Sequence, residues 1–267
     1  SYMFAFCSSY NQALPSTFNT SMVVDMSGMF RSCSAYNQPL PNSFNTQRVT
    51  DMSEMFYGCT SYNKALPNVF NTSLVTNMKS MFYDCSSYNE PLPSSFNTER
   101  VTNMELMFQG CSIYNHALPS SFTTSLVTDM SLMFYDCRAF NQNLGSLNLG
   151  AVTNMTGMLT NSGLSVTNYD ATLTGWNDGG YTNKDLGDAS PLKYCAAQAA
   201  RTNLITNKGW TITGDKACTN ITTVGTLLPF TACEGTASVA QSFTVSGSGL
   251  TADISIAAPS GFEVSTA

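Results

Sequence analysis

Residues 49–59 read Val49-Thr50-Asp51-Met52-Ser53-Glu54-Met55-Phe56-Tyr57-Gly58-Cys59, and this stretch recurs with small changes every 26 residues. Its Met-Phe pair and its cysteine return at fixed positions. The cysteines of this column are Cys7, Cys33, Cys59, Cys85, Cys111 and Cys137. A fixed period of this length predicts a solenoid, in which each repeat forms one unit and packs only on its neighbours.

Within one repeat, the apolar residues Met52, Met55, Phe56 and Cys59 are spaced i, i+3, i+4 and i+7, which is the apolar face of a short helix. Further along, Pro67 lacks an amide hydrogen and disfavours helix, so this half of the repeat is expected to be extended or turned. We therefore predict an α/β-type, leucine-rich-repeat-like solenoid. Its 26-residue repeats each combine a short helix with a short extended segment.

Other columns keep the same register. Each repeat offers about eight apolar side chains to the core, each contributing roughly 1.5–3 kcal/mol when fully buried. A single repeat cannot bury them, whereas a stack can. An asparagine column is predicted to hydrogen-bond the backbone of the adjacent turn, because buried amides need partners. Its members are Asn11, Asn37, Asn63, Asn89, Asn115 and Asn141.

The six repeat cysteines have two interpretations, buried free thiols or disulfides along the stack. We favour small, buried, apolar residues of a structural core column, because pairing would leave identical units in different states. The column has no CxxC spacing, which argues against zinc. Cys195 and Cys218 lie outside the column, and we predict a disulfide between them that staples a small cap.

The repeat pattern weakens after Leu144, where Gly145 replaces the proline and one residue is lost. We therefore place the solenoid at residues 1–163. The sequence opens in the middle of a repeat, so we expect a truncated N-terminus and a larger parent polypeptide. Residues 220–267 contain short strands between Gly, Pro and Ser turns, and they predict the incomplete start of an immunoglobulin-like β-sandwich.

Residues 164–219 differ from both neighbours and predict a small helical C-terminal cap. Helices are expected over residues 166–176 and 192–207. Trp176 and Trp210 are expected to cover the open end of the stack.

Composition excludes several classes of function. Charged residues make up only 10% of the chain and the net charge is -6. The negative charge argues against binding to nucleic acid or to anionic lipid. No run of 18 apolar residues exists, so we expect no membrane insertion. The surface is instead expected to carry Ser, Thr and Asn, as on many secreted proteins.

No catalytic apparatus is evident. His116 is the sole histidine and lies in a variable, polar column, so a solvated surface residue is expected rather than a general base. The turns at residues 177–179 and 213–215 could contribute to a calcium site, but turns this short more often only turn the chain. We therefore expect no enzyme, no metal site and no cofactor.

The repeat x-Val-Thr-Asp/Asn-Met-x-x-Met-Phe-x-x-Cys-x-x-Tyr-Asn-x-x-Leu-Pro-x-x-Phe-Asn-Thr resembles the 26-residue repeat of BspA-like bacterial surface proteins, which are leucine-rich-repeat relatives. The stretch from Leu192-Lys193-Tyr194-Cys195 to Trp210-Thr211-Ile212 resembles the segment that closes such arrays in Bacteroidetes-type proteins. The tail from Phe230 to Val264 resembles immunoglobulin-like modules of large secreted proteins of the same bacteria. The resemblance implies a cell-surface or secreted multidomain protein, often an adhesin, with export by the type IX route. It supplies no catalytic residues.

Two main functional hypotheses remain. The first is an extracellular binding module that contacts glycan or protein, with Tyr57, Tyr83 and Tyr135 exposed in a variable column where they could stack on sugars. The second is a structural spacer within a giant surface filament or fibre, without its own ligand. A third hypothesis, ice binding, would use the threonine column Thr20, Thr46, Thr72, Thr98 and Thr124.

Overall fold

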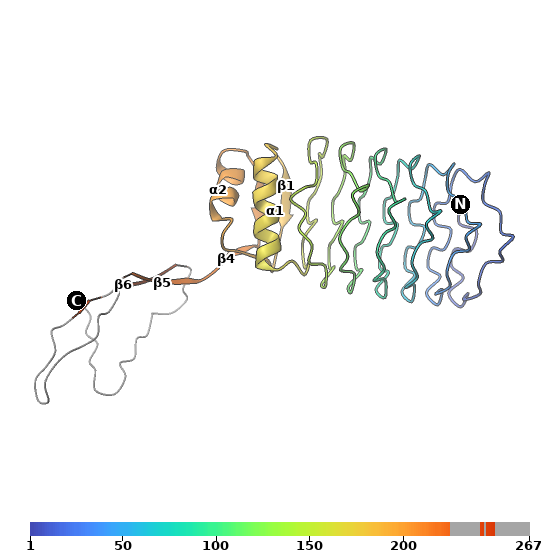
Figure 1. Ribbon diagram of the computed structural model, residues 1–267, viewed down its shortest axis with the longest axis horizontal. Helices are drawn as coiled ribbons and strands as arrows, with labels where there is room; N and C mark the ends of the chain where they lie inside the picture. Colours follow the sequence, from blue (N-terminus) through green and yellow to red (C-terminus); the bar gives the residue numbers. More distant parts are fainter. Residues whose placement is uncertain (225–240, 243, 249–267) are drawn as a thin grey trace, which may run out of the picture. The chain divides into compact units, whose positions relative to one another are not determined.

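The computed structural model describes residues 1–224, 241–242 and 244–248. The chain divides into two compact units, Ser1–Lys216 and Ala217–Ala267. In the first unit each 26-residue repeat forms one coil, and successive coils lie side by side in a stack (Figure 1). Each coil is named below by its cysteine.

The segment that carries the Met-Phe pair is a run of tight turns, and the short helix expected there is not formed. In the Cys59 coil, the Cys59 amide bonds to the Phe56 carbonyl three residues back, at 3.0 Å. The Phe56 amide instead bonds to the Met81 carbonyl of the next coil, at 2.9 Å. Glu54 and Gly58 have left-handed backbone angles, with φ of 57° and 68°. Residues of a right-handed helix do not have these backbone angles, and their amides donate to carbonyls of the same helix, not of another coil.

The core lies inside the coils and consists of columns of like side chains. Met52, Met55 and Phe56 are fully buried, as their spacing indicated. Equivalent rings of neighbouring coils stack on one another, with 5.6 Å between the Phe30 and Phe56 centroids. The columns therefore form continuous apolar files through the stack.

Polar ladders run beside these files. The backbone amide of Asn63 donates to the side-chain Oδ1 of Asn37 at 3.0 Å, and the same bond recurs along the column. This confirms the prediction that the asparagine side chains hydrogen-bond the backbone of the adjacent coil. The threonine column is buried, and Thr46 Oγ1 donates to the Asn71 carbonyl at 2.7 Å. The ice-binding hypothesis needs this column exposed and is therefore wrong.

The six repeat cysteines are all free thiols; five are buried and Cys7 is exposed. Cys7 therefore differs from the buried column that the repeat predicted. Each buried thiol donates to a phenylalanine carbonyl of the preceding coil, as from Cys59 Sγ to Phe30 at 3.0 Å. Burial raises the pKa of Cys33 to about 11. The column thus stabilises contacts between coils and is held in its neutral form.

The cap begins with α1 (Val166–Asp178), which lies across the end of the stack (Figure 1). Ser165 caps the helix by accepting the Asn168 amide. The helix packs closely on the Cys137 coil: a Cβ atom on Gly175 would lie 2.6 Å from Gly145 Cα. This close approach explains why glycine replaces proline at position 145.

The remaining cap elements extend the stack. The Gly157 amide of the last coil donates to the Leu186 carbonyl in β1 (Asp185–Asp188), and β1 pairs in parallel with β3 (Thr211–Thr213). Rings of Trp176 and Trp210 stack at 5.8 Å, and both are buried. The other elements are β2 (Lys193–Tyr194), which pairs with β4 (Lys216–Ala217), and α2 (Gln198–Thr206).

The second cap helix is shorter than residues 192–207, because residues 193–194 are in β2 and α2 starts only at Gln198. Cys195 and Cys218 are both disulfide-bonded. Their pairing with each other stays a prediction. The described residues contain two α-helices, α1 and α2. Neither is long and apolar enough to cross a bilayer.

In the second unit, β5 (Asn220–Val224) pairs antiparallel with β6 (Thr244–Ser248). Residues 249–267, where the sequence predicts more of the immunoglobulin-like module, lie outside the described residues.

Candidate functional site

The side chains of the tyrosine column proposed as a sugar-binding site pack on their neighbours in adjacent coils. The rings of Tyr57 and Tyr83 stack at 4.4 Å with 3° between their planes. The Arg31 guanidinium lies 4.5 Å above the Tyr57 ring. Gln109 Nε2 donates to the Tyr83 hydroxyl at 3.4 Å. Both faces of Tyr57 are therefore covered, and its edge is what remains for a ligand.

Tyr135 belongs to the same column but not to the stacked pair, because Gln109 lies between it and Tyr83 in the repeat register. All three tyrosines are half-buried. The structure thus brings together Tyr57 and Tyr83 and leaves Tyr135 apart.

Arg31 is anchored by an ion pair with Glu54, which also accepts the Tyr2 hydroxyl at 3.0 Å. The pKa of Tyr2 is raised, mainly by this hydrogen bond to Glu54 and to a smaller extent by burial. Phe6 lies on another side of the guanidinium, at 5.9 Å. The sequence analysis did not identify Arg31 as part of this site, because its column of the repeat holds different residue types. Only the stacking of the coils shows that Arg31 lies next to Tyr57.

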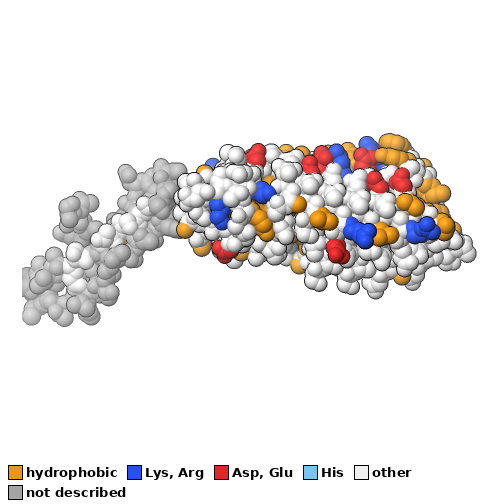
Figure 2. Space-filling model, turned by 90° about the horizontal axis from the view of Figure 1, so that it is seen from above, with side chains coloured by type: hydrophobic (Ala, Val, Ile, Leu, Met, Phe, Trp, Pro, Cys, Tyr) orange, Lys and Arg blue, Asp and Glu red, His pale blue; other side chains and the backbone are white. Residues whose placement is uncertain are grey.

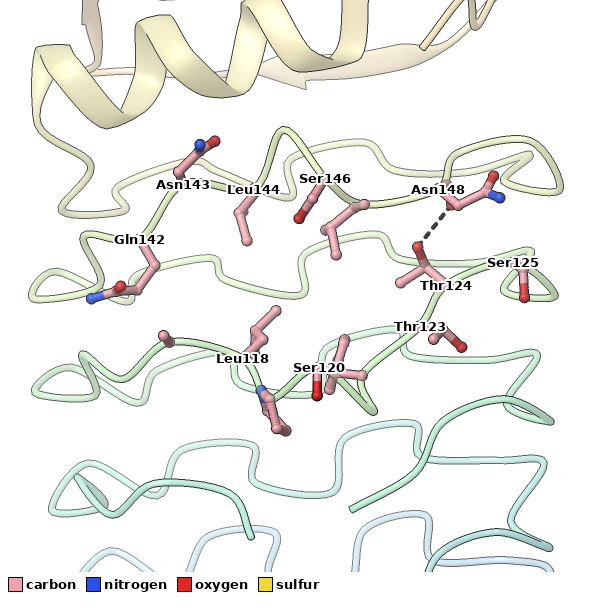
Figure 3. A pocket seen from close by; sticks show the side chains of 14 residues that line it. Leu118, Ser120, Thr123, Thr124, Ser125, Gln142, Asn143, Leu144, Ser146 and Asn148 are labelled. Carbon is pink, nitrogen blue, oxygen red and sulfur yellow. Dashed lines mark hydrogen bonds between the residues drawn. The ribbon is translucent and has the colours of Figure 1, made fainter. Parts of the chain in front are cut away.

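A hollow of about 610 Å³ lies between the Cys111 and Cys137 coils (Figure 3). None of the residues that line it is ionisable. They are Ala117, Leu118, Pro119, Ser120, Phe122, Thr123, Thr124, Ser125, Gln142, Asn143, Leu144, Ser146, Leu147 and Asn148.

The hollow arises from a difference in length between two coils. Phe122 lies four positions after Leu118, but Leu147 lies only three positions after Leu144. The ladder of phenylalanine rings, with 6.4 Å steps, ends at Phe122 because the next coil offers Leu147. Phe122 is 7% exposed, whereas Phe96 is fully buried. The sequence shows that one residue is missing from this coil, but it does not show that the shorter coil leaves a hollow.

The rim of the hollow is polar. Figure 3 shows Leu144 and Ser146 pointing from one coil toward Leu118 on the other. Within the described part of the chain, the hydroxyls of Ser120, Thr123 and Ser146 form no hydrogen bond to protein; Thr123 bonds to Thr98 through its backbone atoms. Apolar side chains form its floor, and free hydroxyls remain for a ligand.

His116 and the two turns considered for calcium lie outside the tyrosine column and the hollow. His116 Nε2 lies 3.1 Å from the Asn89 carbonyl in an exposed setting. In residues 1–224, 241–242 and 244–248, no group of three His, Cys, Asp or Glu residues could hold a metal ion. Asp215, in one of the two turns considered for calcium, is already bonded to Arg201 and Tyr169.

Stacked coils with like residues in register define a repeat protein. The family model described as "Mycoplasma protein of unknown function, DUF285" matches residues 1–69 and again residues 67–176. The two matches span more than half of the chain, which therefore belongs to this family. No curated protein and no solved structure matches the chain.

Proposed function

We propose that the chain is a non-enzymatic binding module of a cell-surface or secreted bacterial protein, and that it contacts glycan or protein on another surface. The observation that carries this proposal is the uncharged hollow of about 610 Å³ in an otherwise continuous stack. Ladders fix the coils on both sides of the hollow. A site that is ordered before its ligand arrives loses less conformational entropy on binding.

Surface composition and cysteine chemistry support a location outside the cell. On the face drawn in Figure 2, charged side chains are few and scattered, in line with a chain of which 10% is charged. Cys195 and Cys218 are disulfide-bonded, and disulfides persist in oxidising compartments. Burial keeps the thiols of Cys33 to Cys137 out of contact with oxidants. The type IX export route remains part of the proposal.

The finer family assignment is also proposed. The repeat consensus supports a BspA-like, leucine-rich-repeat-like solenoid, with turns in the place of the expected helices. We further propose that the module is part of a large adhesin, with neighbouring domains in the same polypeptide. The immunoglobulin-like assignment of residues 220–267 is supported by sequence pattern.

Binding of the purified chain to neutral and charged glycans, extracellular proteins and whole cells tests the function. Saturable binding to one class is expected. Alanine substitution of Tyr57, Tyr83 and Tyr135 tests the tyrosine column separately. Loss of binding in these variants would place the site there, and unchanged binding would remove the column as the site.

The alternative function is a spacer without its own ligand, within a surface filament or fibre. The ladders that run through every coil favour it, because they make a stiff rod independently of any site. It predicts no binding across the whole panel by a folded chain. Specific, saturable binding would contradict it.

A further inference from the structure

We infer that the hollow between the Cys111 and Cys137 coils is a subsite for a neutral saccharide, an inference that rests on the proposed binding function. Its volume of about 610 Å³ lies within the range of small-molecule sites. Six apolar side chains and a rim of hydroxyls and amides line the same space.

The absence of ionisable groups from the lining selects the class of ligand. A sulfated, phosphorylated or carboxylated ligand would bury charge there without a cation to pair with it, which is costly. A neutral sugar brings hydroxyls that match the side chains of Ser120, Thr123 and Ser146. Each of these side chains can both donate and accept.

The floor suits the other half of a sugar. Pyranose rings have apolar C–H faces, and such faces pack on aliphatic and aromatic side chains. Leu118 is half-buried, whereas the equivalent Leu92 is only 6% exposed. The lost residue therefore uncovers apolar surface in this coil, and the hydroxyls stand around it.

The two sides of the hollow are tied together. Thr124 Oγ1 donates to the Asn148 carbonyl at 2.8 Å, so the distance between the coils is fixed at this edge (Figure 3). Gln142 Nε2 donates to Asn115 Oδ1 at 2.8 Å at another point of the same pair of coils. A ligand would thus enter a space that is already shaped.

The test uses the full chain and neutral trisaccharides of glucose, mannose, galactose and N-acetylglucosamine, with sialylated and sulfated glycans beside them. Saturation-transfer NMR and calorimetry give the binding. Ser120→Trp and Ser146→Trp fill the hollow from its two sides. Ser16→Trp is the matched control, because Ser16 follows the same Leu-Pro pair in the first coil and is exposed. Circular dichroism verifies that each variant is folded.

We expect binding of at least one neutral sugar, weakened at least tenfold by Ser120→Trp and by Ser146→Trp but unchanged by Ser16→Trp. Sugar binding that survives both hollow variants would overturn the subsite and leave the binding function standing. A preference for anionic glycans, or binding to proteins alone, would do the same. Silence of the folded chain toward the sugars and toward the wider panel would overturn the subsite and the proposed function together.

Discussion

Arg201 and Asp215 form a two-point ion pair, from Nε to Oδ2 at 2.7 Å and from Nη2 to Oδ1 at 2.5 Å. The Asp215 side chain is fully buried. Tyr169 of α1 donates its hydroxyl to the same carboxylate at 2.9 Å. The Arg201 guanidinium also lies 4.7 Å above the Tyr194 ring. A single carboxylate therefore joins α1, α2 and the turn after β3.

Replacing Asp215 by Asn should destabilise the chain by about 3–5 kcal/mol, because it leaves the Arg201 charge without its partner in a buried site. Urea unfolding measures the change. Arg138→Ala is the control, since Arg138 pairs with Asp136 on the surface, where solvent screens the ion pair and it adds little to stability. Equal losses in the two variants would contradict the importance of the buried pair.

Tyr88→Phe is expected to leave stability unchanged or to raise it by up to about 1–3 kcal/mol. The Tyr88 hydroxyl is buried and has no hydrogen-bond partner in the described part of the chain, so its removal avoids a desolvation cost. Phe140 already occupies the same column. The matched variant Tyr169→Phe should lower stability, because it removes a bond to Asp215. A lower unfolding midpoint for Tyr88→Phe would show that the hydroxyl has a partner.

Thr72→Val should cost about 1–3 kcal/mol. It keeps the shape of the side chain but leaves the Asn97 carbonyl without the hydroxyl that bonds it at 2.7 Å. Thr76→Val is the control on the exposed threonine column. Its Oγ1 bonds to the Thr50 carbonyl at 3.2 Å, and that carbonyl also accepts a backbone amide. Thermal unfolding of both variants should therefore show a clear loss only for Thr72→Val.

Alkaline pH should destabilise the stack through its thiols. Burial raises the pKa of Cys33 from 9.0 to about 11, and raises the pKa values of Cys85 and Cys111 well above their ordinary value. Above pH 9 the unfolded chain loses these protons while the folded chain keeps them. The stabilisation present below pH 9 is therefore lost as the pH rises toward 11 and beyond.

We expect the thermal midpoint, measured without oxygen, to fall from pH 9 to pH 11. The fall should be shallower in a Cys33→Ala variant. A midpoint that does not change over this range would contradict the raised thiol pKa values.

The repeat period predicted the buried columns and the asparagine ladder, because both follow from which residues recur in register. The prediction of a short helix in each repeat was wrong. Turns whose hydrogen bonds reach three residues back bury the same sequence positions as a helix would, so the apolar spacing does not distinguish the two. Residue type also gave no warning of the left-handed backbone, since Glu54, Ser80 and Leu106 all adopt it at equivalent positions. These residues are held there by amides donated to the next coil, which sequence spacing does not show.

The hollow could not be predicted for a different reason. The missing residue before Leu147 is plain in the sequence, but a shorter coil can close up, shift its register or leave a gap. The choice depends on α1, which approaches the chain at Gly145 and holds the coil in place. That contact appears only when both segments are seen in three dimensions.

The bonds of the cysteine column always span 29 residues, whether from Cys59 to Phe30 or from Cys85 to Phe56. Removing or inserting one whole repeat leaves every thiol opposite an equivalent carbonyl. Whole repeats can therefore be duplicated or deleted with little change in free energy per coil. The length of the rod, and with it the distance over which the protein reaches, is the property that evolution can alter most readily.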